Sequence, residues 1–288
     1  MRKKRLLGLG LCLLLCLLTG CRERTELDEG NAVYYWRTDL RLDSTERAFL
    51  KTYHINKVYC RYFDVVMDES GEPMPNATIV FNDTLPAGIE IIPTVYITND
   101  CLQEPHKDLA AKLVKRIRQM NETNDIKGIR EIQIDHDYTA RNMKVYYDFL
   151  EDVKKAWGGT LSTTIRLHQL SMEAPPVDYG ALMIYNTGDP QKFMERNPIL
   201  DQRDVAPYLR YLDDYPLPLA AAYPVFSWLR IISGVEITHT VEASEILQVK
   251  RMVEQERKDL SRSVITYHLD KENINRYKPE TYEEIYHH

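Results

Sequence analysis

Carboxylates alternate with isoleucines in the stretch EIQIDHDYT, residues 131–139, and this spacing is where chemistry is expected. Side chains two positions apart on a strand share one face, so the polar residues here face one way and the isoleucines the other. When two carboxylates share one enclosed site, the pKa of one rises and that group becomes a proton donor. We expect Asp137, nearer the strand tip, to be the acid and Asp135 to support it as the charged partner. The polar face carries Glu131, Gln133, Asp135 and Asp137.

Three other readings of this stretch stay open. Asp135 can pair with Arg61 or Arg166 and fix a strand end without catalysis, because ion-pair networks also fill barrel mouths. A calcium site built from the two aspartates and carbonyl oxygens is the second. A transition-metal site is the third, but His136 faces the opposite way and no HxH or cysteine cluster occurs. We therefore expect neither a metal nor a cofactor.

The elements that must position this pair alternate between strand-like and helix-like segments. Helices are expected from Ser44 as N-cap, and over residues 106–120, 140–157 and 241–260. Eight strands alternating with helices over about 250 residues predict a single-domain (β/α)8 TIM barrel. A doubly wound sheet is the alternative, but no glycine-rich loop follows the first strand. The expected strands are residues 32–36, 57–66, 89–97, 131–139, 160–168, 179–186, 217–226 and 263–270.

Barrel enzymes carry their chemistry at the C-terminal ends of the strands, and this chain places polar and aromatic residues at all eight. Aromatic rings stack on sugar faces and charged groups bind hydroxyls, so the set predicts a carbohydrate cleft. A lone histidine such as His168 is more often a hydrogen-bonded wall residue than a catalytic base. Trp36 and Trp228 suit the hydrophobic core as well as they suit a sugar-binding platform. The expected ligand-binding residues are Trp36, Arg37, Arg61, Asp64, Tyr96, Gln133, Arg166, His168, Asn186, Trp228 and Tyr267.

The N-terminus has the pattern of a bacterial lipoprotein leader. Four basic residues at positions 2–5 precede a leucine run that is too short for a comfortable membrane span. Leu18-Thr19-Gly20-Cys21 resembles a lipobox, in which the chain is cut before the cysteine and the cysteine is acylated. An ordinary secretory signal or an uncleaved anchor is the alternative. We expect a signal peptide over residues 1–20, a lipid on Cys21, a polar tether over 21–31 and the barrel over 32–288.

Charge and cysteine content narrow the partners. The net charge is −6 and no basic run follows the leader, which argues against nucleic acid. Beside the lipid site, Cys60 and Cys101 remain, and the geometry that a disulfide demands favours two free buried thiols. We expect a monomer that contacts the membrane only through its lipid. We expect the protein to be anchored in the cell envelope, at the outer membrane; the sequence does not indicate whether it faces the periplasm or the cell surface.

Two local motifs resemble the family-18 chitinase-like glycoside hydrolases. GIREIQIDHDYT resembles their fourth-strand D-x-x-D-x-D-x-E, and LMIYN resembles their sixth-strand M-x-Y-D/N. The resemblance implies that Asp137 protonates the leaving oxygen, that Asp135 supports it, and that Tyr185 and Asn186 hold the acetamido group of the substrate, which acts as nucleophile. The acid here is Asp instead of Glu, and Gln133 replaces an aspartate. The other alignment puts Thr139 at the acid position.

A broader resemblance covers most of the chain after the leader. It is to envelope proteins with a barrel domain whose reaction is not known, and it rests on a YxW first strand and an IDxD fourth strand. That fourth strand is followed by ARxxxY (Ala140, Arg141 and Tyr146), and an LSxT fifth strand spans Leu161–Thr164. This resemblance implies a fold and a location.

Two functions follow from these observations. The first is a lipid-anchored hydrolase of a glycan, with an N-acetylated glycan as the case that the resemblance implies. The second is a non-catalytic glycan-binding barrel that uses the same cleft after losing the acid. A scaffolding lipoprotein is a third possibility, but no feature of the sequence favours it.

Overall fold

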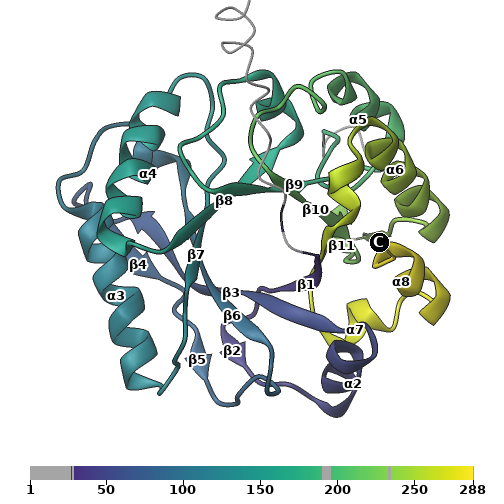
Figure 1. The fold of residues 1–288 in the computed structure, drawn as a ribbon, viewed down its shortest axis with the longest axis horizontal. Coiled ribbons are helices and arrows are strands. Elements are labelled where there is room, and N and C mark those ends of the chain that lie inside the picture. The colour runs from purple at the N-terminus through teal and green to yellow at the C-terminus, as the bar shows by residue number, and fades with distance from the viewer. Residues whose placement is uncertain (1–26, 28, 190–195, 233–234, 288) are drawn as a thin grey trace, which may run out of the picture.

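Eight parallel strands close into a barrel in the computed structural model, which describes residue 27 and residues 29–189, 196–232 and 235–287 (Figure 1). Neighbours follow the order β1-β13-β10-β9-β8-β7-β6-β3, and the pairing of β1 with β3 closes the ring. The predicted (β/α)8 fold is confirmed. The barrel strands are β1 (Gly30–Tyr35), β3 (Ile55–Met67), β6 (Glu90–Ile97), β7 (Glu131–Asp135), β8 (Thr160–Arg166), β9 (Tyr179–Met183), β10 (Leu219–Pro224) and β13 (Ser263–Tyr267).

Helices surround the barrel in Figure 1, and the sequence explains where several of them begin and end. Asp43, instead of Ser44, caps α2, and it forms a capping box with Glu46 because each side chain accepts the other's backbone N–H. Gly158 ends α4 in the left-handed conformation at φ 77°, as its position predicts. The helices are α2 (Ser44–Thr52), α3 (Leu109–Thr123), α4 (Met143–Trp157), α5 (Gln202–Leu209), α6 (Ala243–Glu256), α7 (Lys271–Ile274) and α8 (Pro279–Ile285), with short 3-10 turns η1 (Asn99–Leu102), η2 (Leu167–Ser171) and η4 (Lys258–Ser261).

The connection between β3 and β6 departs from the barrel pattern because it holds two short strands and no helix. β4 (Pro73–Asn76) pairs antiparallel with the end of β3, and β5 (Val80–Phe81) pairs with β2 (Asp39–Leu40). The stretch ESGEPMPNAT, residues 69–78, is rich in turn-forming residues and predicts a loop, and this prediction is wrong for β4. Two prolines on β4 suit an edge strand, because proline has no N–H to offer a further strand.

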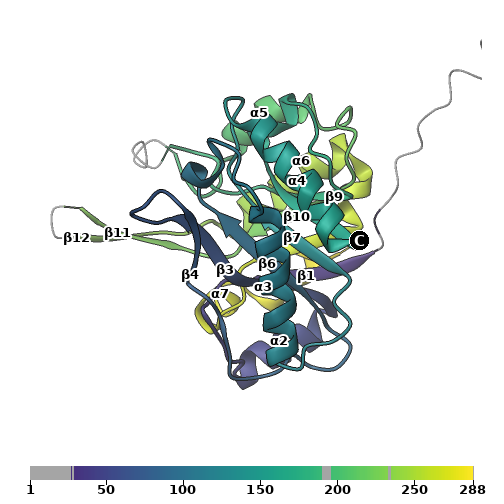
Figure 2. The ribbon, with the colours of Figure 1, turned by 90° about the vertical axis from the view of Figure 1, so that its left-hand side faces the viewer.

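A second hairpin follows β10. β11 (Trp228–Ile232) and β12 (Val235–His239) pair with each other in an antiparallel ribbon. Figure 2 shows this ribbon and the β3–β4 hairpin extending from the same end of the barrel, and Figure 1 places them on opposite sides of it. The two hairpins therefore flank the C-terminal mouth of the barrel.

The barrel interior is polar on the face that the alternation predicts. Tyr34 donates to Gln133 at 2.9 Å, and Ser162 donates to Glu131 at 2.7 Å. Lys57 pairs with Glu131 at 3.3 Å. The isoleucines of β7 are fully buried on the other face. These buried polar groups therefore have partners inside the barrel, which offset the cost of removing them from water.

Candidate functional site

β7 ends at Asp135, so the two aspartates of its motif occupy different surroundings. Asp135 is the last strand residue and points into the barrel, where it is 3% exposed. Asp137 lies two residues beyond the strand, and its side chain is 43% exposed. The expectation that both would lie on the strand is corrected: only Asp135 is held by the sheet, and Asp137 belongs to the loop that follows.

Asp135 is a buried carboxyl with one neutral hydrogen-bond donor. Thr164, on the neighbouring strand β8, donates its hydroxyl to Oδ1 of Asp135 at 2.7 Å. Burial, opposed by the guanidinium of Arg166 and assisted by the charge of Asp137, raises the pKa of Asp135 to about 6. Asp135 therefore keeps its proton to a higher pH than an ordinary aspartate does.

Asp137 instead has a cation beside it. Nε of Arg166, at the end of β8, donates to Oδ1 of Asp137 in an ion pair. The sequence suggested Arg61 or Arg166 as an ion-pair partner of Asp135, but Arg166 pairs with Asp137 instead. The other, Arg61, forms a two-bond pair with Asp64. The raised pKa therefore lies at Asp135, whereas the expected acid Asp137 is in contact with a guanidinium.

A cavity of about 400 Å³ opens beside this pair at the ends of β7, β8 and β9. Tyr185 contributes to its wall, is 4% exposed, and has a hydroxyl without a hydrogen-bond partner among the described residues. A buried, unpaired hydroxyl is costly, so a ligand that supplies its partner gains affinity. The lining residues are Asn99, Asp137, Thr139, Arg166, Leu167, His168, Met183, Tyr185, Asn186, Thr187 and Tyr208.

Aromatic rings gather on the other side of the mouth around Tyr267. Its ring stacks on Tyr185 with centroids 5.1 Å apart, and it meets Trp36 at 5.6 Å and Phe226 at 5.4 Å. Trp228 continues the cluster, 6.4 Å from Phe226. These rings come from β1, β13, the segment after β9 and the segment after β10, so the fold assembles them from distant parts of the chain.

The arginine on β3 supports this aromatic cluster. The guanidinium of Arg61 lies 5.6 Å from the centre of the Trp36 ring, a cation–π contact. Its partner Asp64 is 7% exposed, so the charge of Arg61 is neutralised locally. Tyr96, from β6, lies in the field of Asp137 and Asp135, and its pKa is raised by burial and by both carboxylates. β3 and β6 thus complete the ring of predicted mouth residues.

Two of the predicted ligand-binding residues, Gln133 and Arg37, lie away from the cavity, and His168 lines it from a different element than expected. Gln133 is fully buried below Asp135 and its amide is used by Tyr34 and Ser162, so it does not face the cavity. Arg37 pairs with Glu46 at the start of α2. His168 lies on η2, not on β8, but it lines the cavity together with Asn186.

The cysteines and the histidine of the motif also have clear positions. Cys60 and Cys101 are buried free thiols, as expected. His136 is buried, with Nδ1 2.9 Å from the Ile97 carbonyl oxygen and Nε2 3.2 Å from the Asn142 amide, away from the mouth. The predicted lipidation site Cys21 lies outside the described residues.

The sequence reading missed Thr164 as the hydrogen-bond donor to Asp135. Its position two residues before Arg166 on β8 puts both on the inner face, so the strand period was a usable signal. Asn99, Thr187 and Tyr208 were also missed, because they come from connections whose path a strand pattern does not predict.

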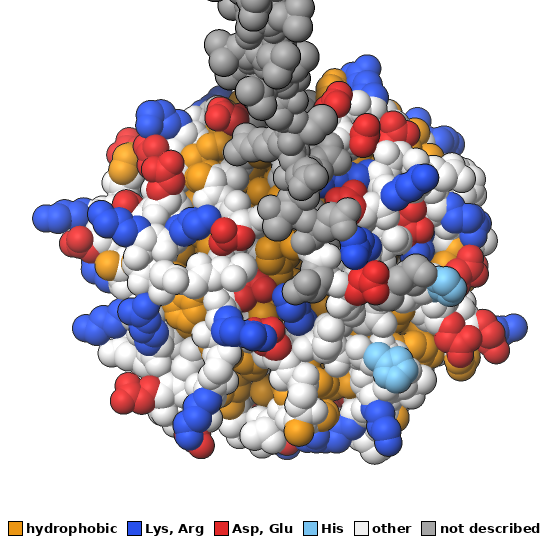
Figure 3. Space-filling model, in the orientation of Figure 1, with side chains coloured by type: hydrophobic (Ala, Val, Ile, Leu, Met, Phe, Trp, Pro, Cys, Tyr) orange, Lys and Arg blue, Asp and Glu red, His pale blue; other side chains and the backbone are white. Residues whose placement is uncertain are grey.

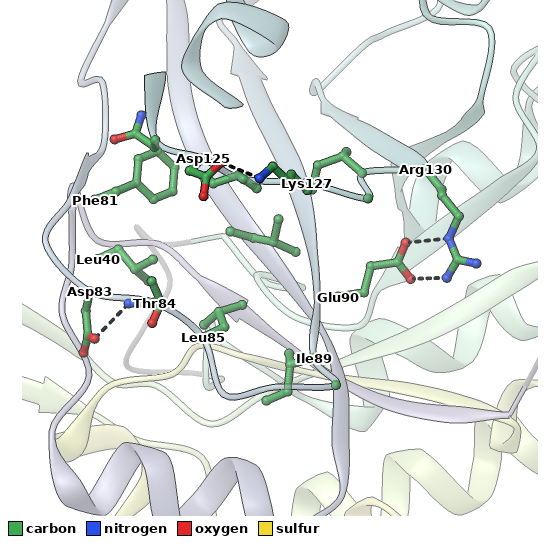
Figure 4. A pocket seen from close by; sticks show the side chains of 16 residues that line it. Leu40, Phe81, Asp83, Thr84, Leu85, Ile89, Glu90, Asp125, Lys127 and Arg130 are labelled. Atoms are coloured by element: carbon green, nitrogen blue, oxygen red, sulfur yellow. Dashed lines mark hydrogen bonds and ion pairs between the residues drawn. The ribbon is translucent and has the colours of Figure 1, made fainter. Parts of the chain in front are cut away.

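A second cavity, of about 420 Å³, lies on the outer flank of the barrel (Figure 4). It is lined by apolar residues of β5, the loop before β6 and the loop before β7, with the Asp125–Lys127 and Glu90–Arg130 pairs at its edge. In this cavity, every charged side chain shown has an opposite partner or a backbone donor. On the face drawn in Figure 3, acidic and basic side chains are interspersed.

Two searches of the described residues complete the description. No group of three or more His, Cys, Asp and Glu side chains is placed to hold a metal ion there. None of the helices in that part of the chain combines the length and the apolar character needed to cross a bilayer.

The fold defines a class: a single-domain (β/α)8 barrel, which similar solved structures share. The spore cortex-lytic enzyme SleL of Bacillus cereus matches 91% of this chain and 74% of its own at 16% identity and a TM-score of 0.55. A xylanase-A-amylase inhibitor protein, XAIP-III, matches 90% of this chain and 98% of its own at 11% identity and 0.52. A GH113 β-1,4-mannanase matches 91% and 98% at 11% identity and 0.51.

These similarities establish the fold. No protein-family model matches the sequence, and no curated protein matches it either. The three similar structures include two described as enzymes and one described as an inhibitor, so the fold alone does not decide between turnover and binding. That decision depends on the residues of the mouth.

Proposed function

We propose that the C-terminal mouth binds a glycan and that the protein is a glycoside hydrolase whose acidic pair is Asp135 and Asp137. One observation carries the proposal: a buried carboxyl that holds its proton to about pH 6 lies next to a second carboxyl at the wall of a cavity. Paired carboxyls with separated pKa values are the usual apparatus for cleaving a glycosidic bond.

The two aspartates have different parts in this proposal. A general acid must reach the glycosidic oxygen, and Asp137 is the member of the pair that lines the cavity. Asp135 lies behind it and keeps its proton up to about pH 6. Asp137 is held by Arg166, so it reaches the glycosidic oxygen only after that ion pair opens.

The remaining mouth residues bind the sugar. The rings of Trp36 and Tyr267 offer apolar faces to a pyranose. Tyr185 offers an unpaired hydroxyl, which suits the acetamido group that the family resemblance implies. Asp64 is tied to Arg61 by two hydrogen bonds and is not free to act as a nucleophile, which favours assistance by the substrate itself.

A non-catalytic glycan-binding barrel is the second candidate function. The contact between Arg166 and Asp137 favours it, because an acid held by a guanidinium does not donate a proton. The similarity to an inhibitor protein of the same fold is consistent with such a role. Both candidates use the same cavity and differ only in whether a bond is cleaved.

Turnover of a panel of aryl glycosides separates the two candidates. The full chain is compared with Asp137→Asn, with Asp135→Asn and with Asp148→Asn, the same chemical change at an exposed helix position. Hydrolysis that is lost in the first two variants and kept in the third supports the enzyme. Glycan binding without cleavage in any protein supports the binding barrel. If no glycan binds and none is cleaved, both candidates fail.

We also propose that Cys21 carries a lipid that anchors the protein in the bacterial cell envelope, since the leader ends in a lipobox-like sequence. Cells grown with a labelled fatty acid are expected to yield labelled protein in the membrane fraction. The Cys21→Ser variant is expected to be unlabelled. Label that persists in Cys21→Ser would place the acylation elsewhere.

A further inference from the structure

Arg166 has more hydrogen-bonding capacity than the protein uses. A guanidinium group has five N–H donors in a planar fork that matches a carboxylate with two parallel bonds. Within the described residues, the Arg166 guanidinium makes one hydrogen bond, from Nε to Asp137. Its side chain is 19% exposed and forms part of the cavity wall. Two Nη groups are therefore left for another acceptor.

The partner that Arg166 now holds is easily displaced. Asp137 lies on the loop beyond β7, outside the hydrogen-bond ladder of the sheet, and 43% of its side chain is exposed. Ion pairs exposed to this degree contribute little to stability, because water solvates the separated partners well. Arg166 itself is fixed at the end of β8. An incoming anion can therefore replace the carboxylate without disturbing the barrel.

The cavity also suits an acidic ligand by its charge. The chain has a net charge of −6, yet the charged lining of this cavity is one carboxylate, Asp137, and one guanidinium, Arg166. His168 adds a ring whose pKa is lowered by burial, so it lines the wall as a neutral imidazole. Asn99 and Asn186 supply neutral donors beside them. Once Asp137 has moved away, the groups that remain at the wall are donors for an anion.

We propose that this cavity takes a sugar that carries a carboxylate, and that the sugar's carboxylate replaces Asp137 on Arg166. The inference rests on the proposed function and names its substrate class. It also explains how an acid held by a guanidinium comes to act. Asp137, released from its cation, is free to turn toward the glycosidic oxygen.

Pairs of sugars in which one member carries a carboxylate and the other is its neutral parent test the exchange. Glucuronate is compared with glucose, and N-acetylmuramic acid with N-acetylglucosamine, by isothermal titration of the full chain. The acidic member of each pair is expected to bind about tenfold more tightly, because it gains a two-bond contact with Arg166. Arg166→Gln is expected to abolish the preference, and Arg166→Lys to reduce it, since an ammonium lacks the fork.

The Asp137→Asn variant gives the most decisive test, because this one change is expected to strengthen binding of the acidic sugar and to abolish turnover. Removing the competing carboxylate is expected to strengthen binding of the acidic sugar several-fold and to leave the neutral sugar unchanged, while turnover is lost. Because this variant removes only an exposed charge, it still decides the question if Arg166→Gln does not fold.

Each outcome of the titrations supports or overturns the exchange. Equal affinity within each pair, or a preference that survives Arg166→Gln, overturns it. A preference that is unchanged or weakened in Asp137→Asn also overturns the exchange. If aryl glycosides of neutral sugars are cleaved while the acidic sugars are not preferred in the titrations, the proposed function stands without the inference. If neither member of any pair binds, the proposed function fails as well.

Discussion

The burial of Asp135 implies a measurable cost in stability at neutral pH. Burial raises the pKa of this carboxyl from its ordinary value of 3.8 to about 6. Below about pH 4 the carboxyl is protonated in both the folded and the unfolded chain, so it has no effect on stability. Between these two values the unfolded chain releases its proton first. The free energy of unfolding therefore falls as the pH rises from about 4 to 6, and the loss remains at higher pH.

The size of the effect follows from the difference between the two pKa values. The difference is about two units, and each unit corresponds to about 1.4 kcal/mol, so the ionised Asp135 lowers stability by about 3 kcal/mol. Asparagine has the same shape, carries no charge, and can still accept the hydrogen bond from Thr164. Asp135→Asn is therefore expected to be more stable than the original protein by up to about 3 kcal/mol at pH 8.

Urea unfolding at pH 4, 5, 6 and 8 measures this difference, with Asp148→Asn as the matched control on the surface. The gain from Asp135→Asn is expected to disappear near pH 4 and to reach its full size above pH 6. A variant that is less stable than the original at pH 8, or a gain that is the same at all four pH values, would refute the assignment of the raised pKa to Asp135.

Three further predictions concern single side chains. Thr164→Val is expected to raise the pKa of Asp135 by about one unit, because the charged carboxylate loses its hydrogen-bond donor. Thr164→Ser keeps the hydroxyl and is expected to leave this pKa unchanged. The pH dependence of the infrared carboxyl band measures the pKa in both variants. Tyr185→Phe is expected to raise the free energy of unfolding by about 1 kcal/mol, because it removes a buried hydroxyl that has no partner in the described structure, and yet to weaken glycan binding. Urea unfolding and titration test this, and a loss of stability with unchanged binding would contradict it. Arg257→Met is expected to cost about 3 kcal/mol in urea, because the buried guanidinium serves three backbone carbonyls and Asp259; a cost below about 1 kcal/mol would contradict this account.

The strands and most helices were predictable from local sequence pattern. Alternation in β7 predicted that Glu131, Gln133 and Asp135 face inward, and their contacts inside the barrel confirm it. Gly158 predicted the end of α4. These features depend on side-chain period and on backbone conformation, which are properties of a few consecutive residues.

The connection between β3 and β6 was not predictable in the same way. Its residues form β4 and β5 only because an edge of β3 and the strand β2 are available to pair with them. Prolines and glycines in this segment correctly indicated that no helix forms. Pairing with a distant strand is a tertiary effect, and local pattern does not carry it.

The positions of the predicted mouth residues followed from the sequence, but the pairing of their charged groups did not; their role in a functional site stays a prediction. Sequence placed Asp135, Asp137, Arg61 and Arg166 at the mouth, and the structure brings them together. The pairing of arginines with aspartates depends on where β7 ends, which is at Asp135. The polar–apolar alternation in the sequence continues to Asp137, so it did not reveal this end. The partners of the carboxyls, and therefore which one holds the proton, follow from geometry across strands.

A crystal structure of Asp137→Asn soaked with an oligosaccharide tests the central claim most directly, because this variant is expected to bind a glycan without cleaving it. We predict sugar density in the mouth, with one ring against Trp36 or Tyr267 and a sugar oxygen within hydrogen-bond distance of the Tyr185 hydroxyl. Density confined to the outer cavity of Figure 4, or an empty mouth at saturating sugar, would contradict the account.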